Sequence, residues 1–289
     1  MPGILYVVAT PLGNLEDVTL RALRVLREVS VIAAEDTRRT ARLLQHYSIS
    51  TPTTSLHAHN EHSRSAKLIE RLIAGDSVAL VSDAGTPVIS DQGVHLVAAA
   101  HDHGIRVEPI PGANAAVAAI SAAGLAGDGF IFAGFPPSRA NARRNWLETL
   151  SHDSRPIVLY EAPHRILGTL RDISGPFAGR KVAIGRELTK AHEILAIRPI
   201  EAWLEAPPPE RGEFTVVIAG ADMPSSEAVP PTDEEVGRFF YRMTHNEELG
   251  RRRALKATAD HFKVSARDVF AAVDRERSRA ADVNSSDDD

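Results

Sequence analysis

The sequence predicts two α/β domains followed by a small helical segment. Three observations support this fold class. Short apolar runs alternate with helical apolar spacing along most of the 289 residues, which is typical of a parallel, doubly wound sheet. Three glycines within 124–129 mark a break between two sets of these units. Three prolines within 223–231 mark a linker before the last helices.

The domain boundaries follow from these breaks. We expect an N-terminal α/β domain over 1–124, a second α/β domain over 125–222 and a small helical domain over 232–278. Residues 279–289 are polar and acidic, and because they offer no apolar face to a core, we expect them to form a disordered tail.

The first domain should alternate strands and helices. Apolar runs predict buried strands at 4–9, 31–34, 78–81 and 105–110. Helical spacing follows at 20–29, from about 39 to 44, and at 65–73, 94–103 and 115–123. The polar segment 55–62 predicts a loop. Its histidines have the spacing H-x-H-x-x-H, which is not diagnostic of a metal site, so we predict no metal.

The second domain repeats this alternation. Strands are expected at 130–135, 157–160, 181–184 and 214–219, and helices at 141–150 and 166–173, with a short helix closing near Trp203. In the last segment, Thr232 and Glu235 form a capping box. Helices are expected there at 233–245, 249–262 and 266–276, the last capped by Ser265.

Composition limits the function classes. The formal net charge is −5, but four aspartates lie in the last eight residues, so the body is nearly neutral. Near neutrality argues against a protein that coats nucleic acid indiscriminately, although local patches can still bind RNA. Cysteine is absent, which excludes disulfides and thiolate metal sites. We see no signal peptide and no apolar run of roughly 18 residues, and expect a cytoplasmic protein without a membrane partner.

Three loops are the strongest candidates for a ligand site. They leave predicted strands at 10–15, 82–87 and 111–115, and all contain glycine or proline with small neighbours. Ligands of open α/β sheets bind at the carboxyl ends of the strands. Any one of these loops could simply turn the chain, but three in one half favour a ligand site. The sequence contains neither G-x-G-x-x-G nor G-K-[ST], so it is not a dinucleotide or phosphate-loop fingerprint.

Charged clusters follow several strands. In the stretch 35–39, Asp36 would cap the next helix, or Asp36 or Glu35 would orient a substrate hydroxyl. Similar clusters occur at 160–165 and 186–190. Arginines at 139, 143, 144 and 251–253 are candidate phosphate contacts or parts of ordinary basic helix faces, and charge alone does not separate these alternatives.

Seven motifs in order resemble one family. They are ATPLGNLEDVTLRAL, AAEDTRRT, LVSDAGTPVISDQG, PIPGANAAVAAIS, FAGFPP, LYEAPHR and GRELTKAHE. Together they resemble the small-subunit ribosomal RNA cytidine 2′-O-methyltransferases, which have the tetrapyrrole methylase-like (class III methyltransferase) fold. The resemblance covers roughly 4–220. The chain departs from the family's usual pattern at Gln92, His95, Asn114 and 194–200.

This resemblance implies a site as well as an activity. It implies 2′-O-methylation of a cytidine in the decoding region of 16S rRNA, free or in the small ribosomal subunit, by a homodimer that binds S-adenosylmethionine between its two α/β domains. The implied cofactor-binding residues are Thr10, Pro11, Leu12, Gly13, Asn14, Ser82, Asp83, Ala84, Gly85, Thr86, Pro87, Pro111, Gly112, Asn114, Ala115 and Tyr160.

A ribose hydroxyl is a poor nucleophile, so an acceptor for its proton should assist the reaction. Our candidate catalytic residues are Asp36, Glu187 and Lys190, the last only if its pKa is depressed. Asp83 is expected to contact the cofactor. The rival hypotheses are a methylase of the same fold that acts on a tetrapyrrole carbon, and a non-catalytic RNA-binding relative.

Overall fold

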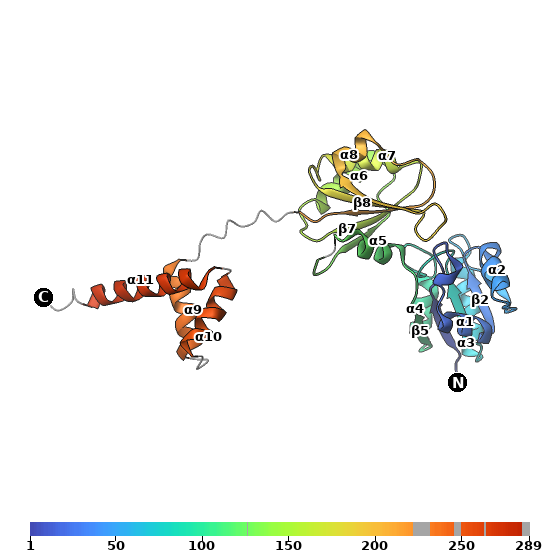
Figure 1. Cartoon of the computed structure of the whole chain (residues 1–289). Coiled ribbons are helices and arrows are strands. Elements are labelled where there is room, and N and C mark those ends of the chain that lie inside the picture. Colours follow the sequence, from blue (N-terminus) through green and yellow to red (C-terminus); the bar gives the residue numbers. More distant parts are fainter. Residues whose placement is uncertain (126, 222–231, 246–249, 263, 285–289) are drawn as a thin grey trace. The chain divides into compact units, whose positions relative to one another are not determined.

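A computed structural model describes residues 1–125, 127–221, 232–245, 250–262 and 264–284. The chain divides into two units, Met1–Ala221 and Asp222–Asp289 (Figure 1). The first contains two β-sheets, and the second contains helices. No helix among the described residues is long and apolar enough to cross a membrane.

The first sheet is entirely parallel. Its strands have the order β3-β2-β4-β1-β5, and every neighbouring pair runs in the same direction. Their bounds are β1 (Ile4–Val8), β2 (Val31–Ala34), β3 (Thr53–Ser55), β4 (Val78–Val81) and β5 (Arg106–Ile110). Strands β2 and β4 are buried at every residue, as expected for central parallel strands with both faces covered. Strand β3 was not predicted, because its three polar residues carry no apolar signal.

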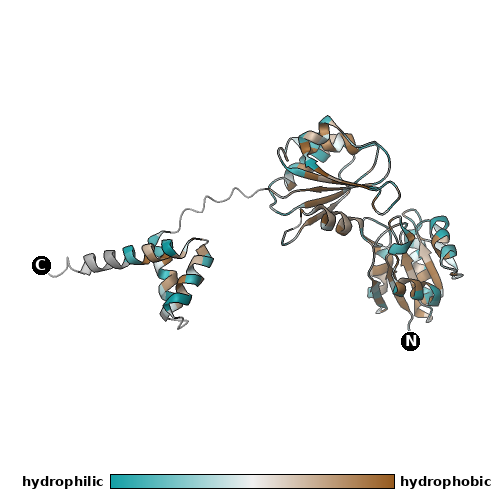
Figure 2. Ribbon diagram, in the orientation of Figure 1, coloured by the Kyte–Doolittle hydropathy of each residue, from teal (hydrophilic) through white to brown (hydrophobic). Residues whose placement is uncertain are grey.

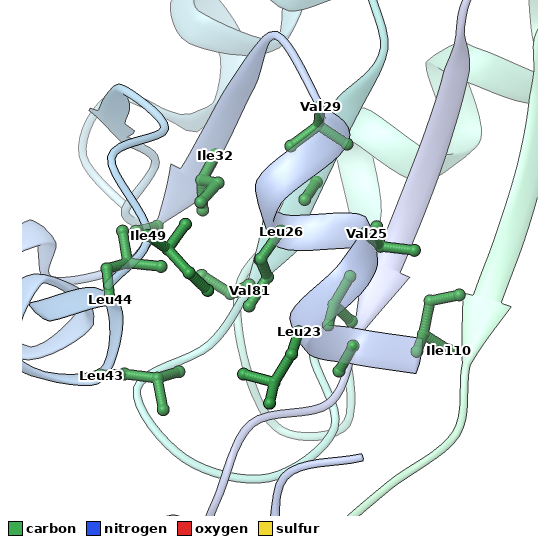
Figure 3. Close-up of a cluster of buried hydrophobic side chains, with 14 residues drawn as sticks. Leu23, Val25, Leu26, Val29, Ile32, Leu43, Leu44, Ile49, Val81 and Ile110 are labelled. Carbon is green, nitrogen blue, oxygen red and sulfur yellow. The ribbon is translucent and has the colours of Figure 1, made fainter. Parts of the chain in front are cut away.

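Helices cover both faces of this sheet. They are α1 (Leu20–Glu28), α2 (Thr37–His46), α3 (Glu61–Ile73) and α4 (Val94–Asp102), with a short 3-10 helix, η1 (Leu15–Asp17), before α1. Leu23 and Leu26 of α1 pack with Leu43 of α2 against the apolar side chains of one face (Figure 3). Leu68 of α3 and Leu96 of α4 pack in the cluster on the other face. The predicted doubly wound arrangement is therefore present here.

The second sheet is mixed. It has the order β6-β7-β10-β8-β9, and only β6 and β7 are parallel. The strands are β6 (Ile131–Gly134), β7 (Ile157–Glu161), β8 (Lys181–Arg186), β9 (Ile194–Pro199) and β10 (Phe214–Ile218). Strand β9 was not predicted; it occupies the segment that departs from the family's usual sequence. The central strands of both sheets are hydrophobic, as their brown colour shows (Figure 2).

Helices also cover both faces of the second sheet. Helices α6 (Ala140–Leu150), α7 (Ile166–Ser174) and α8 (Ile200–Glu205) bury apolar side chains in one cluster. Helix α5 (Ala115–Ala123) packs on strands β7, β8 and β10 through another cluster (Figure 1). Although α5 precedes the glycine-rich break, its buried face is thus completed by the second sheet.

The C-terminal unit contains α9 (Asp233–His245), α10 (Arg251–Phe262) and α11 (Ala266–Asn284) around one apolar cluster. Thr232 and Glu235 form the predicted capping box, and the Asp268 amide donates to the Ser265 hydroxyl. Helix α11 continues to Asn284, into the segment expected to be a disordered tail, because good helix formers such as Arg279, Ala280 and Ala281 carry the helix past its apolar stripe. The predicted linker, 223–231, lies outside the described residues.

Candidate active site

The structure brings the three predicted loops together. Thr10 and Gly85 exchange two backbone hydrogen bonds of 2.8 and 2.9 Å, and the Thr10 hydroxyl donates to the Ser82 carbonyl. The Thr86 hydroxyl donates to the Ala113 carbonyl at 3.1 Å. The loops after β1, β4 and β5 therefore form one hydrogen-bonded wall at the carboxyl ends of their strands.

A cavity of about 400 Å³ lies between this wall and the second sheet. We call it the acidic pocket, because Glu35, Asp83 and Asp91 line it from the first sheet's side. Tyr160 and Phe135 line it from the second sheet's side. Its size falls within the range of pockets that bind small molecules and cofactors.

Burial perturbs two of these carboxyl groups. It raises the pKa of Asp91 to about 6, and the negative charge of Glu35 adds to the effect. Burial also raises the pKa of Glu35, and Asp83 contributes in the same direction. Carboxylates forced together in a partly dry cavity favour a positively charged ligand, because such a ligand would relieve their repulsion.

The loop that carries Asp91 is strained. Val88 and Ser90 have φ values of 74° and 61°, in the left-handed region that non-glycine residues rarely adopt. For a β-branched residue such as Val88 this conformation is particularly unfavourable. Strain of this kind persists where surrounding structure imposes it, and it clusters at functional sites. Here it turns Ile89, Ser90 and Asp91 into the lining of the acidic pocket.

Tyr160 of β7 contacts the start of helix α5 at this pocket. Its hydroxyl accepts a hydrogen bond of 3.2 Å from the Ala116 amide at the start of α5. The rings of Phe132 and Phe135 lie against its ring, with centroids at 5.1 and 5.6 Å. The Tyr160 ring is therefore held in place and offers an apolar, aromatic surface to a ligand.

A second cavity, of about 370 Å³, adjoins the first. We call it the basic pocket, because it is lined by Arg39 and Arg42 of α2 and by Lys190 of the second lobe. The second lobe is the part of the chain built around the second sheet, and the first lobe is the part built around the first sheet. The two pockets share Leu12, Arg39, Asp83, Ala84 and Glu213. They are thus two compartments of one cleft.

Comparison with known proteins places this geometry in a family. The family model described as "Tetrapyrrole (Corrin/Porphyrin) Methylases" matches residues 4–203. The chain belongs to the tetrapyrrole (corrin/porphyrin) methylase family. The tetrapyrrole methylase-like family expected from the sequence motifs is thereby confirmed.

Two curated relatives of this methylase share one name. A protein of Pseudomonas aeruginosa named "Ribosomal RNA small subunit methyltransferase I" is 49% identical over 230 residues, which cover 78% of this chain and 82% of the relative. A protein of the same name from Synechocystis is 46% identical over 273 residues, which cover 93% of this chain and 96% of the relative.

Solved structures confirm the predicted fold class. The structure titled "Crystal structure of the methyltransferase CobJ" matches this methylase with a TM-score of 0.60 at 19% identity, covering 76% of this chain and 95% of the other. Uroporphyrin-III C-methyl transferase from Thermus thermophilus, solved in complex with S-adenyl homocysteine, matches with a TM-score of 0.56 at 18% identity, covering 75% and 97%.

The sequence-predicted cofactor residues of this methylase divide between the pockets. Those in the acidic pocket are Leu12, Asp83, Ala84, Gly85, Thr86, Asn114, Ala115 and Tyr160. Those that line the basic pocket alone are Thr10, Pro11, Gly13 and Ser82. Leu12, Asp83 and Ala84 line both pockets. Asn14, Pro87, Pro111 and Gly112 line neither. Asn14 instead caps η1, and Gly112 allows close approach of its loop to Ala9, since an added Cβ would lie 2.9 Å from the Ala9 Cβ.

Lys190 is the one candidate catalytic residue that lines the cleft directly. Its ammonium group contacts Glu187 at 3.0 Å and Glu213 at 2.9 Å. Burial acts to lower the pKa of Lys190, but hydrogen bonds to Glu213 and Glu187 outweigh it and the pKa is raised. The condition for Lys190 to act as a base is therefore not met, because a lysine with a raised pKa stays protonated.

Asp36 and Glu187 do not line the cleft, but each forms a hydrogen bond with a residue that does. Asp36 caps α2 and binds Arg38 through its side chain, and the Arg38 hydrogen bonds hold the pKa of Asp36 well below its usual range. Its backbone amide donates to Asp83 Oδ1 at 3.0 Å. The Glu187 carboxylate holds Lys190 and accepts from the Glu213 amide at 2.9 Å.

Sequence reasoning missed several residues of the site. Asp91, Phe135, Arg42 and Glu213 line the cleft but were not predicted to do so. Asp91 and Phe135 fall inside quoted motifs, which is the signal that could have found them. No comparable signal marks Glu213, because it precedes a strand rather than following one.

One phosphate-contact candidate is contradicted. Arg143 of α6 is 7% exposed and forms an ion pair of 2.6 Å with Asp172 of α7, so it cannot reach a nucleic acid. The histidines of 55–62 form no group able to hold a metal, and the same holds for all other residues that the structure describes.

Proposed function

We propose that this chain transfers a methyl group from S-adenosylmethionine to the 2′-hydroxyl of a cytidine in the decoding region of 16S rRNA. The joined acidic and basic pockets are the observation that carries this proposal. The names of relatives at 46–49% identity support the RNA substrate. The motifs that the chain shares with cytidine 2′-O-methyltransferases support the ribose oxygen as acceptor.

The acidic pocket fits the methyl donor. S-adenosylmethionine supplies a methyl group on a positively charged sulfur. Glu35, Asp83 and Asp91 offer carboxylates to positive charge on that ligand, and Tyr160 with Phe135 offers rings against which a flat base can pack. The small residues of the β4 and β5 loops leave backbone groups accessible beside these side chains.

Methyl transfer is an in-line displacement, so most of the rate can come from alignment of the reacting atoms. The Thr10–Gly85 bridge fixes the shared wall between the two compartments. Asp36 positions Asp83 through its backbone amide, and Glu187 positions Lys190. We assign Lys190 to substrate contact as a cation, and Asp36 and Glu187 to positioning.

The decisive experiment uses small ribosomal subunits from cells that lack this enzyme. Purified protein and labelled S-adenosylmethionine should restore one 2′-O-methyl group on a cytidine of 16S rRNA, as mapped by ribose-methylation sequencing. Label on a precorrin instead would favour the tetrapyrrole rival. Failure to bind S-adenosylmethionine in calorimetry would favour a non-catalytic relative.

A cytoplasmic homodimer belongs to the same proposal. The resemblance to the methyltransferase family supports both features. Light scattering on the purified chain should give twice the monomer mass of 31.2 kDa, and a monomer at micromolar concentration would contradict it.

A further inference from the structure

We propose that the basic pocket is the RNA acceptor site, in which Arg39 and Arg42 bind backbone phosphates next to the target ribose. The donor occupies the acidic pocket alone. The β1 loop, which the sequence motifs group with the donor loops, then serves the acceptor. This inference rests on the proposed function and assigns its two substrates to separate compartments.

The geometry of α2 supports this assignment. Arg39 and Arg42 are three residues apart, so they project from the same side of the helix, and both line the basic pocket. Thr40 and Leu43 are buried beneath them, which fixes the helix against the sheet. The Arg39 side chain is 60% exposed even though it contacts Asp83 at 3.3 Å. A guanidinium group presents several N–H donors, so Arg39 can maintain its ion pair with Asp83 and bind a phosphate at the same time.

Charge separates the two compartments. Glu35, Asp91 and Glu161 line the acidic pocket alone, and Arg42 and Lys190 line the basic pocket alone. Arg39, Asp83 and Glu213 line both. In the basic pocket, the ammonium of Lys190 is already held by two carboxylates and Arg39 by one. Arg42 is exposed at the rim of the basic pocket. A phosphodiester therefore meets Arg42 in the basic pocket, whereas the charged side chains confined to the acidic pocket are all carboxylates, which would repel it.

The location of the β1 loop completes the argument. Thr10, Pro11 and Gly13 line the basic pocket, and only Leu12 of this loop also reaches the acidic pocket. The wall shared by the pockets is thin, since Leu12, Asp83 and Ala84 face both. A ribose oxygen in the basic pocket is thus next to a methyl group held in the acidic one.

Arg42→Ala tests the assignment, with Arg24→Ala as the matched control. Arg24 is an exposed arginine on α1 that pairs with Glu28 and lines neither pocket. Two bindings are measured: S-adenosylhomocysteine by calorimetry, and small-subunit RNA by titration at several salt concentrations. For Arg42→Ala we expect unchanged S-adenosylhomocysteine affinity, weaker RNA binding, and a salt slope reduced by about 1, since one phosphate contact is lost. Arg24→Ala should match the wild type in both.

Two results would overturn the assignment. If Arg42→Ala weakened S-adenosylhomocysteine binding and left RNA binding unchanged, the basic pocket would be the donor site instead. Unchanged binding of both ligands would remove Arg42 from the acceptor site. Both are read from binding, so they are distinct from a failure of the proposed function, in which the wild type binds both ligands but leaves the cytidine 2′-hydroxyl unmethylated. Thermal unfolding of each variant verifies that the fold is intact.

Discussion

The Lys190 side chain packs against Gly13, and this contact joins the two lobes at the cleft. A Cβ added to Gly13 would lie 2.2 Å from the Lys190 Cγ. Beside it, the Asn14 amide donates to the Thr189 hydroxyl at 3.1 Å. Thr189 and Glu187 both have positive φ values, so the second lobe adopts a strained turn in order to reach the β1 loop. The absence of a side chain at Gly13 is what allows this close approach.

Gly13→Ala should therefore destabilise the junction. The new methyl group overlaps the root of the Lys190 side chain, where no simple rotation of the tip relieves the clash. We expect a loss of about 1–3 kcal/mol in the free energy of unfolding, as for other overpacked contacts. Urea denaturation measures it. A double variant, Gly13→Ala with Lys190→Ala, should recover most of the loss, and additive effects of the two substitutions would show that the clash is not the cause.

Asp91 should make stability and donor binding depend on pH. Its folded-state pKa is about 6, against 3.8 for the unfolded chain, so the native state binds the proton more tightly. Stability should thus fall as pH rises from about 4 to 6, and Asp91→Asn should remove this contribution. Affinity for S-adenosylmethionine should rise around pH 6, where Asp91 of the folded protein ionises and attracts positive charge.

Calorimetry with wild type and Asp91→Asn from pH 5 to 8 measures this effect. The dependence that remains in the variant reports Glu35, whose pKa is also raised. Identical pH dependence in the two proteins would exclude Asp91 from the donor site.

Asp172→Ala should destabilise the second lobe strongly. It leaves Arg143 buried without its ion-pair partner, and an uncompensated buried charge costs about 3–5 kcal/mol. Glu28→Ala, which breaks the exposed Arg24–Glu28 pair, is the control and should cost about 0.5 kcal/mol or less. Comparable losses in urea denaturation would contradict the structural role of the buried pair.

Lys190→Arg should keep much of the methylation activity, whereas Lys190→Ala should lose it. Because the pKa of Lys190 is raised, the residue acts as a fixed positive charge, which arginine can replace. Methylation rates for both variants from pH 7 to 10 provide the measurement. If lysine were a base, Lys190→Arg would be inactive and the wild-type rate would increase as lysine lost its proton.

The sequence by itself determined most of the elements, although not strands β3 and β9, and it determined the three loops. Apolar runs such as 78–81 can only be buried on both faces of a sheet, so strand β4 and the loop after it were predictable. Local hydrogen bonding likewise determined the caps at Asp36, Thr232 and Ser265. The motifs determined the family. All these features depend on residues close together in the chain.

Only the tertiary structure decided how the cleft is divided. The Asp83 carboxylate accepts a hydrogen bond from the Asp36 backbone amide and contacts Arg39, each more than 40 positions away in the sequence. Lys190 contacts Gly13 from the other lobe. Neither contact leaves a local pattern in the chain. The same is true of Arg143, which the sequence offered as a phosphate contact and the fold buried against Asp172. Charge identity is local information, but whether a charge faces a ligand or a partner depends on long-range packing.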